Sequence, residues 1–201
     1  MDPTDPLAAG ATPADPLVAA ARRGDSDAVA RLYQREHREV WRLCLGFLAD
    51  RHEADDAAQD AMLKLLDQLD SFDATRSFAS WRNAVVLNHC RDRLRRRHAR
   101  ARAETDAAAR ELPPALPSPL DHAQRDEVRE LIATSLARLT PREREVFVLH
   151  DLQGEAANVV AAALDIAPST VRVLLMTARR RLRELLAPRL ALPANSKGSG
   201  R

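Results

Sequence analysis

The chain has 201 residues, of which 45% are hydrophobic and 30% charged, and its formal net charge is +2. Only 3% of the residues are aromatic and only 6 are glycine, which disfavours β-sandwiches and barrels and favours helices. No segment approaches the roughly 18 uninterrupted apolar residues of a membrane span, and the acidic N-terminus is unlike a signal peptide. We therefore expect a cytoplasmic protein without membrane insertion.

The first 100 residues contain three expected helical segments. Residues 1–15, rich in Pro, Ala and Asp, are expected to be a disordered lead-in. Apolar residues at helical spacing predict helices at 25–48 and 53–69, and a loop at 71–76 leads into a basic helix that ends near Arg102. In the second helix several apolar side chains are expected to face a core. They are Met62, Leu63, Leu65, Leu66 and Leu69.

Charge is segregated within this part of the chain. From Arg76 to Arg102 there are nine Arg and one acid, Asp92, a net charge of 9 − 1 = +8. From Asp25 to Asp73 there are six bases and twelve acids, a net charge of 6 − 12 = −6. At roughly 100° per residue, two faces of the basic helix separate. The face expected to bind nucleic acid holds Trp81, Val85, Asn88, Asp92 and Arg95, and the core face holds Ala84, Val86, Leu87, Cys90 and Leu94.

Four prolines between residues 113 and 119 forbid a continuous helix there and predict a linker. Beyond it a helix is expected at 124–139. Thr140, Pro141 and Glu143 form a capping box that starts the next helix, which continues to about Asp151. A short helix at 156–164, a turn at 165–168 and a final helix at 169–186 have the spacing of a helix-turn-helix.

Little in the sequence indicates catalysis or a cofactor. Cys44 and Cys90 lack the spacing of a zinc site and are expected to be buried small hydrophobic residues. The six histidines form no metal-binding pair and are expected at the surface. Nucleophile-elbow, phosphate-loop and dinucleotide motifs are absent from the sequence, so we expect no metal, no cofactor and no enzyme activity.

Five sequence blocks, taken together, resemble the extracytoplasmic-function (ECF) sigma factors, the small promoter-recognition subunits of bacterial RNA polymerase. The resemblance covers about residues 15–186. The blocks are EADDAAQDAML (53–63), the FD loop with SFxxW (72–81), NHCRDRLRRR (88–97), LARLTPREREVFVLHDLQG (136–154) and TARRRLRELL (177–186).

This resemblance implies an all-α fold of two small helical domains joined by a Pro-rich linker, the second with a helix-turn-helix. The expected boundaries are 16–103 for sigma region 2, 104–122 for the linker, 123–188 for sigma region 4 and 189–201 for a tail. The implied partners are the RNA polymerase core (the clamp of its β′ subunit and the flap of its β subunit), promoter DNA and an anti-sigma factor.

The resemblance also implies roles for individual residues. The clamp would be bound by an acidic group on one helix, namely Glu53, Asp55, Asp56, Gln59 and Asp60. The −10 promoter element, where a base is turned out of the stack, would be bound by Arg76, Ser77, Phe78, Trp81, Asn88, Asp92, Arg93, Arg95, Arg96 and Arg97. The −35 element would be bound by Arg172, Val173, Met176, Thr177, Arg179, Arg180 and Arg183.

Two departures from the family pattern affect base recognition. The loop FDATRSFASW is one residue shorter than the usual FDPxRGSFRAW and lacks its glycine. The recognition helix reads TVRVLLMTA in place of TVKSRLHRA, so apolar side chains stand where polar contacts are common. Direct reading of base edges needs donors and acceptors. We therefore predict that Arg172, Arg179, Arg180 and Arg183 hold phosphates while the −35 bases are read weakly.

Two alternatives stay open from the sequence. One is a free-standing helix-turn-helix regulator that binds duplex DNA without polymerase, and it leaves the acidic group of 53–60 unexplained. The other is a sigma-like decoy that holds core polymerase or an anti-sigma factor without initiating transcription. Run-off transcription with core polymerase distinguishes these from a sigma factor.

Overall fold

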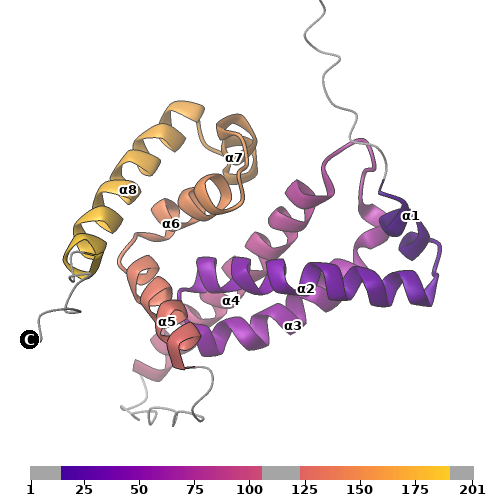
Figure 1. Cartoon of the computed structure of the whole chain (residues 1–201), viewed down its shortest axis with the longest axis horizontal. Coiled ribbons are helices and arrows are strands. Elements are labelled where there is room, and N and C mark those ends of the chain that lie inside the picture. The colour runs from indigo at the N-terminus through magenta and orange to yellow at the C-terminus, as the bar shows by residue number, and fades with distance from the viewer. Residues whose placement is uncertain (1–14, 106–122, 191–201) are drawn as a thin grey trace, which may run out of the picture. The chain divides into compact units, whose positions relative to one another are not determined.

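The computed structural model describes residues 15–105 and 123–190, which form helices and turns with no strand among them (Figure 1). The predicted all-α fold is confirmed. The chain divides between Asp121 and His122 into two compact units, each of which is considered by itself. Most of the predicted lead-in, linker and tail lies outside the described residues.

Four α-helices and one 3₁₀ turn make up the described part of the first unit. They are α1 (Pro16–Arg22), α2 (Ser26–Leu48), α3 (Arg51–Asp67), η1 (Leu69–Ser71) and α4 (Phe78–Thr105). The first three helices begin at aspartates because Asp15, Asp25 and Asp50 each accept 3.0 Å hydrogen bonds from backbone N–H groups of the first turn. Such a cap stabilises a helix by about 1 kcal/mol.

Helix α2 is the central element of this unit, since it packs against α1, α3 and α4, and Figure 1 shows it alongside α3. The side chains at these contacts are removed from water almost completely. The largest of them are Leu32, Val40, Leu43, Met62, Leu65, Val86 and Leu87. Burial of a side chain of this size contributes about 1.5–3 kcal/mol.

Three predictions about exposure in the first unit are wrong. Val85, assigned to the ligand face of α4, is buried, because α2 and α3 both pack on this helix and cover more of it than one narrow stripe. His89, expected at the surface, is buried for the same reason. Leu63, expected in the core, is 61% exposed, because it shares the outer face of α3 with Gln59 and Asp67.

Both cysteines are buried, as predicted, but their proximity was not foreseen. The Sγ atoms of Cys44 on α2 and Cys90 on α4 lie 3.9 Å apart, and both residues are free thiols. The contact with Cys44, together with burial, raises the pKa of the Cys90 thiol well above its usual range. The Cys90 thiol therefore stays protonated at neutral pH and behaves as a packing group.

The second unit contains the predicted capping box and helix-turn-helix. Its elements are α5 (Ala123–Ala137), α6 (Pro141–Phe147), the π-helical turn η2 (Val148–Leu152), α7 (Ala157–Leu164) and α8 (Pro168–Leu190). At the start of α6, Thr140 Oγ1 accepts from Glu143 N at 3.4 Å, and the Glu143 carboxylate accepts from Thr140 N at 2.9 Å. The capping box predicted from the sequence is confirmed.

Helices α7 and α8 meet at 102°, within the range of a helix-turn-helix. Asp165 makes the turn with φ 54°, a left-handed conformation that Asp tolerates better than most residues. Ala156, at the start of α7, provides no side-chain cap, because alanine has no hydrogen-bonding group. Within the described residues no single helix is long and apolar enough to span a membrane, and the bent α7–α8 pair meets that criterion only when both helices are counted together, by length and composition alone.

Candidate nucleic-acid and protein interfaces

The acidic group of 53–60 lies on one helix, α3, with most of its side chains in water. Asp55, Asp56, Gln59 and Asp60 are exposed, and Glu53 is half-buried. Trp41 Nε1 donates to Asp55 Oδ1 at 2.6 Å, which anchors that carboxylate to α2. The exposed Leu63 follows Gln59 by one turn and adds an apolar group to this surface, which we call the acidic face of α3. The position of Leu63 on this surface was not foreseen from the sequence.

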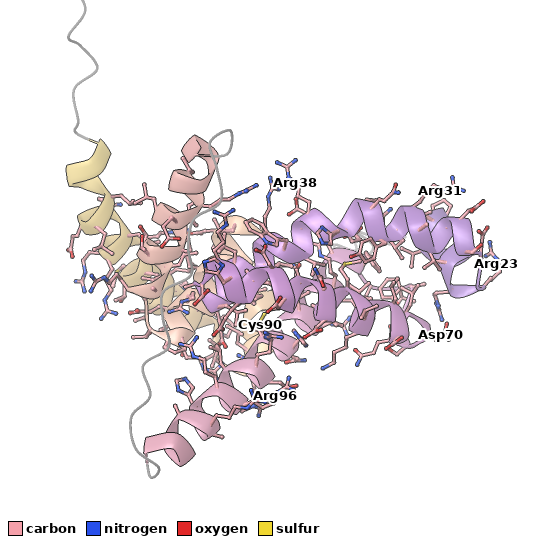
Figure 2. The ribbon with its side chains drawn as sticks, turned by 90° about the horizontal axis from the view of Figure 1, so that it is seen from below. Arg23, Arg31, Arg38, Asp70, Cys90 and Arg96 are labelled. Carbon is pink, nitrogen blue, oxygen red and sulfur yellow. The ribbon has the colours of Figure 1, made fainter. Side chains whose placement is uncertain are left out.

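The C-terminal half of α4 carries the predicted arginine group, and the structure brings it against α3. Arg97 Nη1 lies 2.7 Å from Glu53 Oε1, and Arg93 Nη1 lies 2.8 Å from Asp60 Oδ2. These residues line a cleft together with Arg96, Arg100 and Ala101, which we call the arginine cleft. Figure 2 labels Arg96 on this part of α4. Two residues predicted to bind protein are therefore paired with two predicted to bind DNA.

These ion pairs are weak enough to exchange for other partners. The side chains of Arg97 and Asp60 are more than half exposed, and pairs of that kind contribute about 0–1 kcal/mol. Among the described residues, no carboxylate pairs with Arg96, which donates to the Asp92 backbone carbonyl at 3.3 Å. The arginine cleft therefore keeps positive charge available to an incoming anion.

Asp92, also predicted at the −10 interface, has partners within its own unit. It forms an ion pair with Arg95 on the same helix and lies 3.8 Å from Lys64 Nζ on α3. The hydrogen bond from Arg95, which outweighs partial burial, lowers the pKa of Asp92. Asn88, one turn earlier, is exposed. Asp92 therefore connects α4 to α3 and orients the arginines around it.

Two predicted −10 residues at the start of α4, Phe78 and Trp81, form an aromatic group with the buried Phe72 of the preceding segment. Phe72, Phe78 and Trp81 have ring centroids 5.3–5.5 Å apart, and Arg35 Cζ lies 5.8 Å from the Phe78 centroid. Phe78 and Trp81 are half-buried, so each packs on the core and leaves one part in water. In the preceding loop, Arg76 and Ser77 are exposed.

The loop itself is held by Asp73. The Asp73 Oδ1 atom accepts from Thr75 N at 2.9 Å and from Thr75 Oγ1 at 2.7 Å. The hydrogen bond from the Thr75 backbone lowers the pKa of Asp73. The structure thus brings Arg76, Ser77, Phe78 and Trp81 together. The arginines at 93–97 lie apart from them, since Arg93 follows Trp81 by about 18 Å of helix and Arg97 follows Phe78 by about 28 Å.

A buried ion pair supports the aromatic group and was not foreseen. Arg82 Nη1 on α4 lies 2.7 Å from Glu36 Oε2 on α2, and the two side chains are only 9% and 6% exposed. Arg82 also donates to Asn83 Oδ1, and Arg35 Nε lies 2.7 Å from the other Glu36 oxygen. One signal was present in the sequence, because Glu36 stands one turn from Leu32 and one turn from Val40, both wholly buried.

In the second unit the predicted −35 residues lie along α8. Arg172, Val173, Met176, Arg179, Arg180 and Arg183 are all exposed, while Thr177 is half-buried. The Thr177 hydroxyl donates to the Val173 carbonyl at 3.1 Å, within the same helix. A groove beside α8 is lined by His150, Ala157 and Leu175 as well as Met176 and four of these arginines.

The arginines of α8 fall into two classes. Arg179 forms a bidentate ion pair with Asp151, with N–O distances of 2.8 and 2.5 Å. These hydrogen bonds raise the pKa of Arg179. Arg181 Nη1 lies 2.7 Å from Glu143 Oε2. These two fasten α8 to η2 and α6. In the described part of the chain, no carboxylate pairs with Arg172, Arg180 or Arg183. The phosphate contact predicted for Arg179 would require it to leave Asp151.

A search of the described residues found no group of His, Cys, Asp and Glu side chains that could hold a metal ion. The geometry is that of two helical units, one with adjacent acidic and basic regions and one with a helix-turn-helix whose second helix carries arginines without a carboxylate partner among the described residues. This combination defines a DNA-binding protein with an additional surface for a protein partner.

Comparison with known proteins assigns both units. Residues 32–100 match Sigma-70 region 2, and residues 129–182 match Sigma-70 region 4. The ECF RNA polymerase sigma factor SigM of Mycobacterium tuberculosis is 34% identical over 170 residues, which cover 85% of this chain and 83% of SigM. SigW of Bacillus subtilis is 26% identical over 174 residues, 82% of this chain and 92% of SigW.

Two solved structures have a similar fold. CnrH, solved in complex with the cytosolic domain of CnrY, superimposes with a TM-score of 0.61 at 27% identity, covering 86% of this chain and 96% of CnrH. RpoE of Bartonella quintana has the same fold, with a TM-score of 0.62 at 21% identity over 79% of this chain and 96% of RpoE. The chain belongs to the ECF family of RNA polymerase sigma factors.

Proposed function

We propose that this sigma factor divides promoter-specific initiation between its units. The first unit, sigma region 2 in 16–103, binds core polymerase and the −10 element, and the second, sigma region 4 in 123–188, binds the −35 element. The linker is 104–122. The observation that carries the proposal is the juxtaposition of an exposed acidic face on α3 with an arginine cleft on α4, which offers oppositely charged surfaces to protein and DNA.

The acidic face of α3 is the surface we assign to the clamp of the β′ subunit. Its contacts would be made by Glu53, Asp55, Asp56, Gln59 and Asp60. Leu63, exposed beside them, supplies an apolar group that polymerase binding would remove from water. The β flap is the expected contact of the second unit on the same enzyme.

The −10 element would be contacted at two places in the first unit. Arg76, Ser77, Phe78 and Trp81 form the place where an extruded base could stack, because aromatic rings bind bases of any sequence and a nearby cation holds the phosphate. Asn88, Asp92, Arg93, Arg95, Arg96 and Arg97 form the other. Along α4 the two places are about 10 Å apart at their facing residues, Trp81 and Asn88, and about 28 Å apart at their outermost residues, which corresponds to about three to eight nucleotides of a stacked strand.

At the −35 element, the second unit would hold phosphates through Arg172, Arg180 and Arg183, with Arg179 joining if it leaves Asp151. Val173, Met176 and Thr177 lie between them. The chain would act in the cytoplasm with polymerase and have no catalytic activity of its own, because polymerase carries out the chemistry. An anti-sigma factor is a further proposed partner; CnrH has been solved with the cytosolic domain of another protein, CnrY.

The acidic face can be tested with a matched pair of charge reversals. Asp56 and Asp67 are both exposed acids on the same side of α3, but Asp67 lies outside the group 53–60, about 16 Å along the helix from Asp56. We expect Asp56→Arg to weaken binding of the full-length chain to bacterial core polymerase about tenfold, since placing like charges against a complementary surface costs more than 1 kcal/mol. Asp67→Arg should leave the affinity within about twofold of the unmodified chain.

The readouts are the dissociation constant for fluorescently labelled core polymerase and core-dependent run-off transcription from genomic templates. Equal effects of the two reversals would contradict the placement of the clamp contact. A chain that binds core polymerase but yields no transcript from any template would contradict the initiation role. Specific duplex binding without polymerase would indicate a free-standing regulator instead.

A further inference from the structure

The outer face of α8 has an apolar centre. Val173 is 58% exposed and Met176 is 65% exposed, although they stand in the first half of the second helix of the helix-turn-helix. The inner face of α8 is already packed by other apolar residues, namely Val171, Leu175 and Ala178, so Val173 and Met176 are not part of the core. Two large apolar side chains are thus held in water at the position from which such a helix contacts bases.

This apolar centre is surrounded by unpaired positive charge. At roughly 100° per residue, Arg172, Val173, Met176, Arg180 and Arg183 fall within an arc of about 100°. The three arginines are exposed and have no carboxylate partner among the described residues, whereas Arg179 and Arg181 are engaged inside the unit. Because these three arginines surround the apolar centre, the ligand that fits this face best is a polyanion.

Polar groups that could read bases are scarce within the same arc. Thr177, at its edge, already donates to the Val173 carbonyl at 3.1 Å. Ser169, at the first turn of α8, and the arginines are the remaining hydrogen-bonding side chains. In the major groove of duplex DNA the one apolar group that distinguishes a base pair is the C5-methyl of thymine. The polyanion that also offers apolar contacts is therefore thymine-containing duplex DNA.

We propose that Val173 and Met176 contact thymine methyl groups in the −35 element and make these methyls the main source of base discrimination by the second unit. The proposal rests on the proposed function, because it takes α8 as the −35 reader. The arginines bind phosphates on either side without regard to sequence, and the methyl contacts set which base pairs are accepted at the centre of the site.

The test replaces thymine by deoxyuridine, which removes the methyl group and leaves base pairing unchanged. The −35 element is first located by sequencing run-off transcripts made with full-length chain and core polymerase. Each −35 thymine is then replaced singly in duplex promoter DNA, and holoenzyme affinity is measured. Burying one methyl contributes enough for a three- to fivefold effect, so we expect that loss at one or two positions.

Variants connect the loss to the two side chains. Val173→Ala together with Met176→Ala should abolish the difference between thymine and deoxyuridine DNA while the affinity for core polymerase stays unchanged. Leu185→Ala is the matched control, because Leu185 is also an exposed apolar residue of α8, at 38%, but lies on the opposite side of the helix. It should preserve the methyl effect in full.

Several results would overturn the proposal. They are a −35 element without thymine, affinities unchanged by every deoxyuridine replacement, and a double variant that loses affinity equally for both DNAs. Loss of core binding alone in the double variant would instead mark the face as a protein contact. If −35 base changes have no effect on the holoenzyme at all, the proposed role of the second unit fails as well, and this outcome is distinct from the others.

Discussion

The buried ion pair between Arg82 and Glu36 allows a quantitative prediction about the first unit. Arg82→Met keeps the long apolar stem of the side chain and removes the guanidinium. The Glu36 carboxylate, 6% exposed, then loses its 2.7 Å partner, and Asn83 Oδ1 loses two donors at 3.0 and 3.3 Å. The defect is thus a buried charge and a buried carbonyl with fewer partners, while the packed volume changes little.

Breaking a buried ion pair on one side costs about 3–5 kcal/mol. Because Arg35 still lies 2.7 Å from the second Glu36 oxygen, we expect the lower end, about 3 kcal/mol. For a unit of this size each kcal/mol corresponds to about 4–8 °C in Tm, so the melting temperature of the first unit should fall by roughly 12–24 °C.

Tryptophan fluorescence measures this unit selectively, because the chain has two tryptophans and both, Trp41 and Trp81, lie in the first unit. Urea unfolding of the full chain, followed by this signal, gives the free energy of unfolding of the first unit. Adding Glu36→Gln to Arg82→Met should recover at least about 1 kcal/mol, because an amide is less costly to bury than an unpaired carboxylate. A loss below about 1 kcal/mol for Arg82→Met, or no recovery in the double variant, would refute the reasoning.

Three further predictions concern single contacts. Asp151→Asn should free Arg179 from its pair with Asp151 and strengthen holoenzyme binding to duplex DNA at low salt, with a steeper dependence of affinity on salt; an unchanged salt slope would count against it. Burial lowers the pKa of His89 below its usual 6.5, so the unfolded chain takes up the proton first, and the stability of the first unit should decline as the pH falls below 6.5. When stability is measured by urea unfolding, the His89→Gln variant should lack the part of this decline that is due to His89. A pH profile identical to that of the unmodified chain would contradict the assignment. Glu143→Ala removes half of the capping box and the partner of Arg181, and should destabilise the second unit by about 2–3 kcal/mol; hydrogen exchange of α6 amides measures this, with exposed Glu184→Ala as control.

Local signals in the sequence predicted local structure well. The capping box at Thr140 and the turn that begins at Asp165 depend on residues within four positions of each other, and both are confirmed. The helices follow from periodicity in the same way. The family resemblance, based on five blocks spread over both units, is confirmed by the matches to sigma regions 2 and 4.

Contacts between distant segments could not be predicted in this way. Arg82 stands in a strongly basic stretch, and nothing close to it in the sequence indicates a carboxylate partner, but α2 brings Glu36 against it from 46 residues away. Leu63 is apolar and was expected in the core, yet α3 turns it outward. The pairing of Arg93 with Asp60 and of Arg97 with Glu53 likewise depends on how α3 and α4 cross. The roles assigned to these residues remain predictions.

The two ion pairs between α3 and α4 have a thermodynamic consequence. Any protein that captures the Glu53 and Asp60 carboxylates takes them from Arg97 and Arg93, and the two guanidiniums then attract a nucleic-acid strand more strongly. By linkage, a strand bound to those arginines must favour capture of the carboxylates by the same factor. Two ligands of opposite charge would thus bind this small helical unit cooperatively without any movement of its backbone.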